Sequence, residues 1–157
     1  MSQTMAGQDK THDDFFHATA IAFGARGVLI LGPSGAGKSS LAVELISRGA
    51  RLVGDDRLML SGEGGRLLAR PRPGFEGRIE CRGVGLLTVP AVAEAEIALV
   101  IDAGREERDR LPPPREILLF GCSLPLLHRS PEAQFPAAVL LMMTGGAHDA
   151  ANDPTDD

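Results

Sequence analysis

Residues 32–39 follow the pattern G-x-x-x-x-G-K-S. Glycines in such a loop let backbone N–H groups turn inward around phosphate oxygens, while the lysine reaches the outer phosphates and the serine hydroxyl can ligate Mg²⁺. The segment therefore predicts a binding site for a nucleoside triphosphate. The expected nucleotide-binding residues are Gly32, Pro33, Ser34, Gly35, Ala36, Gly37, Lys38, Ser39 and Ser40.

Two elements must position this loop, and the sequence contains both. Residues 27–31 are an apolar run typical of a short buried strand, and residues 39–48 carry apolar side chains at helical spacing until Gly49. Such a helix would aim its first amide groups at a bound phosphate. A glycine-rich turn with an incidental lysine, which is the alternative, would require neither element.

A second pair of reactive side chains, Asp55 and Asp56, follows the strand-like run 51–54. Neighbouring residues on a strand face opposite sides, so only one carboxylate would face the phosphates unless the strand ends there. One could bind a metal ion or accept a proton, and the other could be structural. The sequence leaves open which aspartate has which part.

The length of 157 residues fits one domain. We expect a flexible polar arm over residues 1–16, a catalytic domain over 17–144 and a flexible acidic tail over 145–157. The first residues are too polar for a signal peptide, and no apolar run approaches the ~20 residues needed to span a bilayer. The chain is therefore predicted to be cytoplasmic.

The composition excludes several classes of protein. A net charge of −5 argues against broad, nonspecific nucleic-acid binding. Lys10 and Lys38 are the only lysines, so the N-K-x-D motif of guanine-specific GTPases cannot be built, and arginine must supply most phosphate clamps. Without Trp or Tyr, a base pocket would be made of aliphatic side chains or Phe. Cys81 and Cys122 receive no functional role.

Short β-type runs and a second helix complete the expected fold. The glycine-rich residues 62–65 predict a tight turn, so the runs on either side should pair antiparallel in a mixed sheet. Residues 132–143 form the second expected helix, interrupted early by Pro136. The expected strands after the first helix are residues 51–54, 58–60, 66–69, 78–82, 85–89 and 97–101.

Three stretches taken together resemble the HPr kinase/phosphorylase family. Residues 32–56 are similar to its core, which holds the phosphate loop and the paired aspartates. Residues 80–89 resemble its E-x-R-G-x-G signature, and residues 109–111 resemble a later D-R-L element. The resemblance covers about residues 17–111.

The family implies an α/β fold with a mixed sheet and flanking helices, the P-loop kinase fold shared with phosphoenolpyruvate carboxykinases. It implies transfer of phosphate from ATP, with Mg²⁺, to a serine of an HPr-like phosphocarrier protein of the phosphotransferase system. It also implies a homo-oligomer, and neither nucleic acid nor a membrane is an expected partner.

Residue by residue, the resemblance makes Asp56 the general base and places His17, Lys38 and Arg110 in the catalytic site. Without that match, His17 beside two phenylalanines would read as packing, and His12, His128 and His148 have no such support. Magnesium would be held by Ser39 and Glu80, with Asp55 as a further candidate. The acceptor-site segment would contain Glu80, Arg82, Gly83 and Gly85.

The match also has limits. The chain resembles a short, single-domain form without the additional N-terminal domain of longer relatives. Residues 124–129 stand where those relatives carry an arginine- and glycine-containing segment linked to phosphorolysis. Phosphorolysis would need Asp56 protonated at the start, with Asp55 and Glu80 as neighbouring carboxylates. Serine kinase activity is the prediction, phosphorolysis stays open, and the alternatives are a small-molecule kinase or a non-catalytic ATP sensor.

Overall fold

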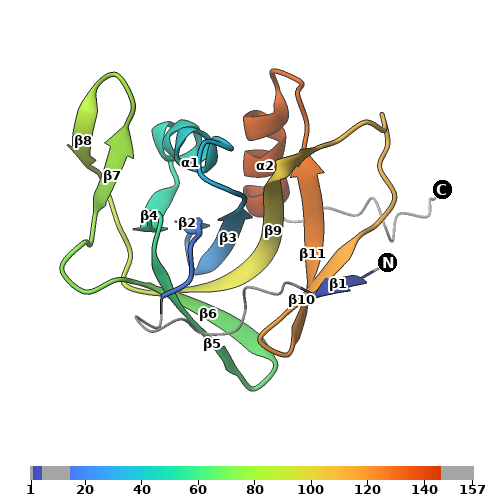
Figure 1. Ribbon diagram of the computed structural model, residues 1–157, viewed down its shortest axis with the longest axis horizontal. Helices are drawn as coiled ribbons and strands as arrows, with labels where there is room; N and C mark the ends of the chain where they lie inside the picture. Colours follow the sequence, from blue (N-terminus) through green and yellow to red (C-terminus); the bar gives the residue numbers. More distant parts are fainter. Residues whose placement is uncertain (1, 5–14, 146–157) are drawn as a thin grey trace.

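A computed structural model of the chain describes residues 2–4 and 15–145 (Figure 1). The strands are β1 Ser2–Thr4, β2 Thr19–Phe23, β3 Arg26–Leu31, β4 Arg51–Gly54, β5 Leu58–Glu63, β6 Arg66–Pro71, β7 Arg78–Cys81, β8 Gly85–Thr88, β9 Ala95–Glu106, β10 Glu116–Leu119 and β11 Cys122–Arg129, and the helices are α1 Lys38–Ser47 and α2 Phe135–Thr144.

The main sheet is mixed, as predicted. Its strand order is β1-β10-β11-β9-β3-β2-β4, and the hairpin β5–β6 joins it through β6, which pairs with β9. The central strands β3, β9 and β11 are parallel, whereas β2 is antiparallel to both β3 and β4. The phosphate loop leaves the carboxyl end of β3 and leads directly into α1 (Figure 1).

Strand β3 is buried on both faces, which explains its continuous apolar sequence. Leu29 and Leu31 belong to one core cluster, which is shared with residues of β5, β6, β10 and β11. Val28 and Ile30 point the other way and pack in a second cluster with residues of α1 and α2. The strand that carries the phosphate loop is thus held between two cores.

The predicted hairpin at residues 62–65 is confirmed. Strands β5 and β6 are antiparallel, and Glu63 pairs with Arg66 across a two-residue turn. Gly64 and Gly65 both have positive φ, 63° and 81°, which is the backbone of a type I′ turn and is accessible to glycine without strain. A second hairpin, β7–β8, forms its own small sheet and stands away from the main one (Figure 1).

The first helix is confirmed within one residue at each end. The second differs from its prediction, because α2 begins at Phe135 and contains Pro136 in its first turn. The expectation that Pro136 interrupts an earlier helix is wrong, since proline at the first helical positions has no intrahelical N–H bond to lose. Neither helix in the described part of the chain has the length and apolar character needed to cross a membrane.

Four strands were not predicted: β1, β2, β10 and β11. Strand β2 is rich in alanine, which has low strand propensity, and its place between β3 and β4 decides its conformation. Strand β1 pairs in parallel with β10, so part of the expected N-terminal arm lies in the sheet. Residues 1, 5–14 and 146–157 lie outside the described chain, so the full arm and the acidic tail stay predictions.

Candidate nucleotide and phosphoacceptor site

The phosphate loop depends on glycine at positions where another residue would not fit. Gly32, Gly35 and Gly37 have φ of 145°, 85° and 91°, in the region that disfavours L side chains. A β-carbon on Gly37 would also lie 2.6 Å from Nη1 of Arg129. Helix α1 starts directly after Gly37 without a side-chain cap, so its N-terminal amides are suited to an anion.

The ammonium group of Lys38 is held at the loop by hydrogen bonds to two backbone carbonyls. Its side chain is buried, with 9% of the residue exposed. Its Nζ donates to the carbonyl of Gly32 at 2.7 Å and to that of Pro33 at 3.2 Å. The ammonium group therefore already lies at the loop that would hold the phosphates.

Asp55 is fixed by donors from three different elements. The hydroxyl of Ser39 donates to Asp55 Oδ1 at 2.7 Å, and the buried hydroxyl of Thr19 donates to the same oxygen at 3.0 Å. The backbone N–H of Glu80 donates to Asp55 Oδ2 at 3.5 Å, a long hydrogen bond. The aspartate that faces the phosphate-loop serine is therefore Asp55, which answers the question that the sequence left open.

Asp56 occupies a different environment from its neighbour. Strand β4 ends at Gly54, so the alternation of a strand no longer applies. Asp56 has a φ of 71°, its side chain is exposed, and its N–H donates to Thr19 Oγ1 at 3.3 Å. A non-glycine residue in this conformation is strained, and such residues gather at functional sites. The structure keeps Asp56 beside the Asp55 cluster with its carboxylate open to a substrate.

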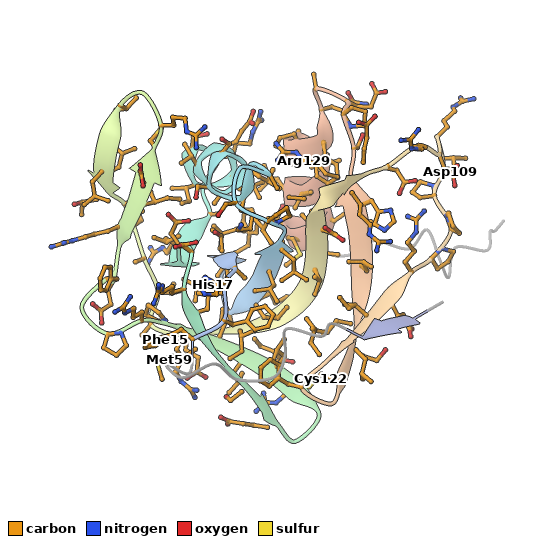
Figure 2. The ribbon with its side chains drawn as sticks, in the orientation of Figure 1. Phe15, His17, Met59, Asp109, Cys122 and Arg129 are labelled. Carbon is orange, nitrogen blue, oxygen red and sulfur yellow. The ribbon has the colours of Figure 1, made fainter. Side chains whose placement is uncertain are left out.

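His17 lies next to the same turn. Phe16 pairs with Leu58 and Ala20 with Gly54, so residues 17–19 run alongside residues 55–57. The imidazole of His17 is exposed, on the side of the molecule where β5 begins (Figure 2). The predicted neighbourhood of His17 and the paired aspartates is therefore present, while the role of His17 stays a prediction.

The predicted acceptor segment forms the β7–β8 hairpin. Glu80, Arg82, Gly83 and Gly85 are all exposed, and only the backbone of Glu80 contacts the carboxylate cluster among the described residues. The hairpin also exposes two apolar side chains, Val84 at 72% and Leu86 at 65%. One end of the hairpin thus touches the site while the rest faces solvent.

Arg110 is not brought to the other predicted residues. It is exposed in the loop between β9 and β10, and its neighbour Asp109 lies far across the molecule from the β7–β8 hairpin (Figure 2). Within the described residues, no hydrogen bond or ion pair joins Arg110 to the phosphate loop or the paired aspartates. The geometry gives its predicted catalytic role no support.

The structure adds Arg129, which the sequence reasoning missed. Arg129 Nη1 donates to the carbonyls of Gly37 and Ala36 at 3.0 and 3.3 Å, across 92 and 93 residues of sequence. The pairing of β11 with β9 is irregular between His128 and Arg129, and such irregularities commonly redirect a side chain. The arginine-rich composition predicted clamps of this type, but nothing in the sequence singled out this one.

Asp102 is a second acidic residue close to the loop that sequence reasoning overlooked. It follows the apolar run of β9 and pairs with Leu31, the last residue of β3. Its Oδ1 accepts the N–H of Gly104 at 2.9 Å, and its Oδ2 lies 3.5 Å from Arg105 Nε. An acidic residue ending an apolar strand was a pattern available in the sequence.

A charged cluster lies beyond β9, away from the phosphates. Arg115 donates to Glu107 Oε1 at 2.5 Å and lowers the pKa of that carboxyl. Burial lowers the pKa of His128, the nearby Arg115 lowers it further, and its Nε2 is buried without a hydrogen-bond partner among the described residues. His128 therefore favours its neutral form. His12 and His148 lie outside the described residues.

The donors at the site suit magnesium. Ser39 and Asp55 offer hard oxygen ligands 2.7 Å apart beside the phosphate loop. In the described residues, no group of three or more His, Cys, Asp or Glu side chains could hold a metal ion by itself. Mg²⁺ is normally held by one or two carboxylates together with substrate phosphates and water, so the residues present fit such an ion.

Comparison with known proteins finds related sequences over much of the chain. Residues 8–102 match the family described as HPr Serine kinase C-terminal domain. Among curated proteins, HPr kinase/phosphorylase of Clostridium beijerinckii is 39% identical over 92 residues, covering 54% of this chain and 30% of that protein. HPr kinase/phosphorylase of Clostridium acetobutylicum is 37% identical over 102 residues, covering 59% and 34%.

A solved structure extends the match to the fold. The HPr(Ser) kinase/phosphatase of Coxiella burnetii superposes with a TM-score of 0.67 at 29% identity, covering 80% of this chain and 90% of that one. The chain spans only about a third of the length of the two clostridial relatives. With the family match over residues 8–102 and the shared mixed α/β fold, the chain belongs to the family of HPr serine kinase C-terminal domains.

Proposed function

We propose that the chain binds ATP with Mg²⁺ and transfers the γ-phosphoryl group to a serine of an HPr-like phosphocarrier protein. The observation that carries the proposal is the 2.7 Å hydrogen bond from Ser39, in the phosphate loop, to Asp55, whose neighbour is the exposed Asp56. A nucleotide-binding element, metal-binding oxygens and a free carboxylate thus meet in one place. Phosphoryl transfer requires that combination.

Ser39 and Asp55 would hold the magnesium ion. When bound, the ion would supply positive charge that neutralises the phosphates. Glu80 was also predicted as a ligand, and its side chain is exposed beside Asp55 with only the backbone in contact. In the proposal, Glu80 stands at the edge of the metal site.

The remaining steps depend on Lys38, on the acceptor serine and on Asp56. Lys38 leaves the carbonyls of Gly32 and Pro33 for the phosphates, which are stronger acceptors because they are charged. The serine oxygen bonds to the γ-phosphorus while the bond from that phosphorus to the β–γ bridging oxygen breaks. Asp56 accepts the hydroxyl proton, and ADP leaves. The reverse reaction would begin with Asp56 protonated.

Transfer of label is the direct test. The purified chain would be incubated with Mg²⁺, ATP labelled at the γ-phosphate and an HPr-like phosphocarrier, and the modified residue would be mapped by mass spectrometry. We expect label on a serine of the carrier. Label on a histidine, or on a small molecule supplied instead, would contradict the proposal. ATP binding without any transfer would indicate a nucleotide sensor.

Asp56→Asn tests the proposed base. Asparagine tolerates positive φ, so the fold should persist, and ATP affinity should stay near that of the wild type. Transfer should fall by about 10²–10⁴-fold, the usual contribution of a general base. Asp109→Asn, the same change in the loop beyond β9, is the matched control and should leave turnover unchanged. Normal turnover in Asp56→Asn would remove Asp56 from this role.

A further inference from the structure

The loop after β6 holds an arginine whose guanidinium lies over two aromatic rings. The guanidinium carbon of Arg72 lies 4.6 Å from the ring centroid of Phe75 and 5.2 Å from that of Phe15. Both distances are within the range of cation–π attraction. These ring contacts hold the half-buried side chain of Arg72 in place. They leave the N–H groups of its guanidinium available as hydrogen-bond donors.

Arg72 lies beside the turn that carries the proposed base. Pro71, the residue before it, pairs with Leu58, and Leu58 exchanges backbone hydrogen bonds of 2.8 and 2.9 Å with Phe16. Phe15 and His17 therefore flank the same point, and Figure 2 shows both on that side of the molecule. Arg72 directly follows Pro71, and Leu58 lies two residues after Asp56, so this strand pair connects Arg72 to the turn that carries Asp56.

Arg72 also differs from the arginines of β6, the strand that precedes it. Arg66 Nη1 lies 3.3 Å from Glu96 Oε1, and Arg70 Nε lies 3.0 Å from Glu94 Oε1. The guanidinium of Arg72 makes no hydrogen bond or ion pair with any described residue, and its backbone carbonyl accepts the N–H of Phe75 at 3.1 Å. Because ring contacts of this kind do not use the N–H donors, which lie in the plane of the guanidinium, a carboxylate can accept two of them.

Two further exposed arginines follow this loop in the chain, together with the exposed Glu76 and Glu80. Arg78 and Arg82, on the neighbouring hairpin β7–β8, are exposed and have no acidic partner among the described residues. Phe75 is 52% exposed and adds apolar area to the same loop. Such a surface complements a protein that presents an acidic side chain next to an apolar one.

We propose that Arg72 is a specificity-determining residue that binds a carboxylate of the acceptor protein close to the serine that is phosphorylated. The inference rests on the proposed function and adds a feature of the acceptor to it. The two phenylalanines act as positioning residues, because they hold the guanidinium in the orientation that a bidentate contact needs.

Arg72→Gln, compared with Arg66→Gln, is the first test. Arg66 is the first residue of β6 and Arg72 follows its last residue, but Arg66 already forms an ion pair with Glu96. With an HPr-like phosphocarrier as the probe, Arg72→Gln should raise the acceptor KM about tenfold or more, as expected for a lost charge-assisted hydrogen bond, and leave the ATP KM unchanged. Arg72→Lys should recover only part of the loss, since it lacks the planar fork.

A charge exchange then identifies the partner group. Each Asp and Glu near the acceptor serine of the phosphocarrier would be changed to Lys in turn and tested against Arg72→Glu. One carrier variant should be poor with the wild-type chain and improved with Arg72→Glu. Phe75→Leu should raise the acceptor KM by a smaller factor. Melting temperatures would show that each variant is folded.

The outcomes separate the two proposals. If the wild-type chain phosphorylates the carrier and Arg72→Gln has the wild-type acceptor KM, only the role of Arg72 is overturned. If no carrier variant is rescued by Arg72→Glu, the carboxylate contact is overturned. A rise in the ATP KM instead would assign Arg72 to the nucleotide. If the wild-type chain transfers nothing to the carrier, the proposed function fails and the inference fails with it.

Discussion

The phosphate loop and the β7–β8 hairpin differ sharply in how they are held. On the loop side, Lys38 and Arg129 donate to backbone carbonyls of the loop and Ser39 donates to Asp55, at 2.7–3.3 Å. On the hairpin side, among the described residues, the N–H of Glu80 contacts this cluster through a 3.5 Å hydrogen bond to Asp55. The difference indicates that the nucleotide side is built in advance, whereas the acceptor side needs a partner to complete it.

The largest expected effect concerns the nucleotide side. Asp55→Asn removes the charge that Ser39, Thr19 and Glu80 surround, so kcat should fall by about 10²–10³ and the Mg²⁺ requirement should rise. Thr19→Val, which removes one donor to Asp55 and keeps the shape, should have a smaller effect in the same direction. Turnover measured against Mg²⁺ concentration decides this. An unchanged Mg²⁺ dependence in Asp55→Asn would contradict a metal role for Asp55.

Arg129 tests whether the nucleotide side can be altered without affecting the acceptor side. Arg129→Gln breaks contacts to Ala36 and Gly37, so the ATP KM should rise about tenfold while the acceptor KM stays constant. Arg108→Gln, a change at an exposed arginine in the loop beyond β9, serves as the control. Equal changes in both KM values would show that the two sides are not independent.

A change on the hairpin side should raise the acceptor KM and leave the ATP KM unchanged. Leu86 is 65% exposed, so Leu86→Ser should leave the melting temperature unchanged. If the partner covers this side chain, the acceptor KM should rise several-fold with no effect on ATP, because the change removes apolar area from the interface. Leu111→Ser, at an 87% exposed leucine elsewhere, is the matched control. Equal acceptor KM values for the two variants would exclude Leu86 from the docking surface.

The smallest effect concerns acid sensitivity at the charged cluster beyond β9, outside both sides. The pKa of His128 lies below its ordinary value of 6.5 in the folded chain, so below about pH 6.5 the unfolded chain binds the proton first and the free energy of unfolding falls. His128→Asn should reduce this decline between pH 7 and 5, measured by urea denaturation. The pKa of Glu107 is lowered from 4.5, so the stability that its ionised carboxylate contributes should be lost only at lower pH. An identical pH dependence in the variant would contradict the prediction for His128.

Local patterns in the sequence were sufficient for the strand, loop and helix of residues 27–48 and for the hairpin of β5 and β6. They succeeded because hydrophobic period and glycine placement act over a few residues. Strand β2 could not be found in this way, since its alanine-rich sequence takes its conformation from β3 and β4 on either side. Proline at the start of α2 was misread as a break for a related reason, because its effect depends on where the helix begins.

The sequence by itself determined that a phosphate-binding loop is followed by two consecutive aspartates, and it identified the family later shown by comparison. Only the tertiary structure decided that Asp55 faces Ser39, that Arg129 reaches the loop from 92 residues away, and that Arg110 does not join them. The physical reason is that residue type and spacing encode local chemistry, whereas strand order and the end of β4 decide which distant side chains meet.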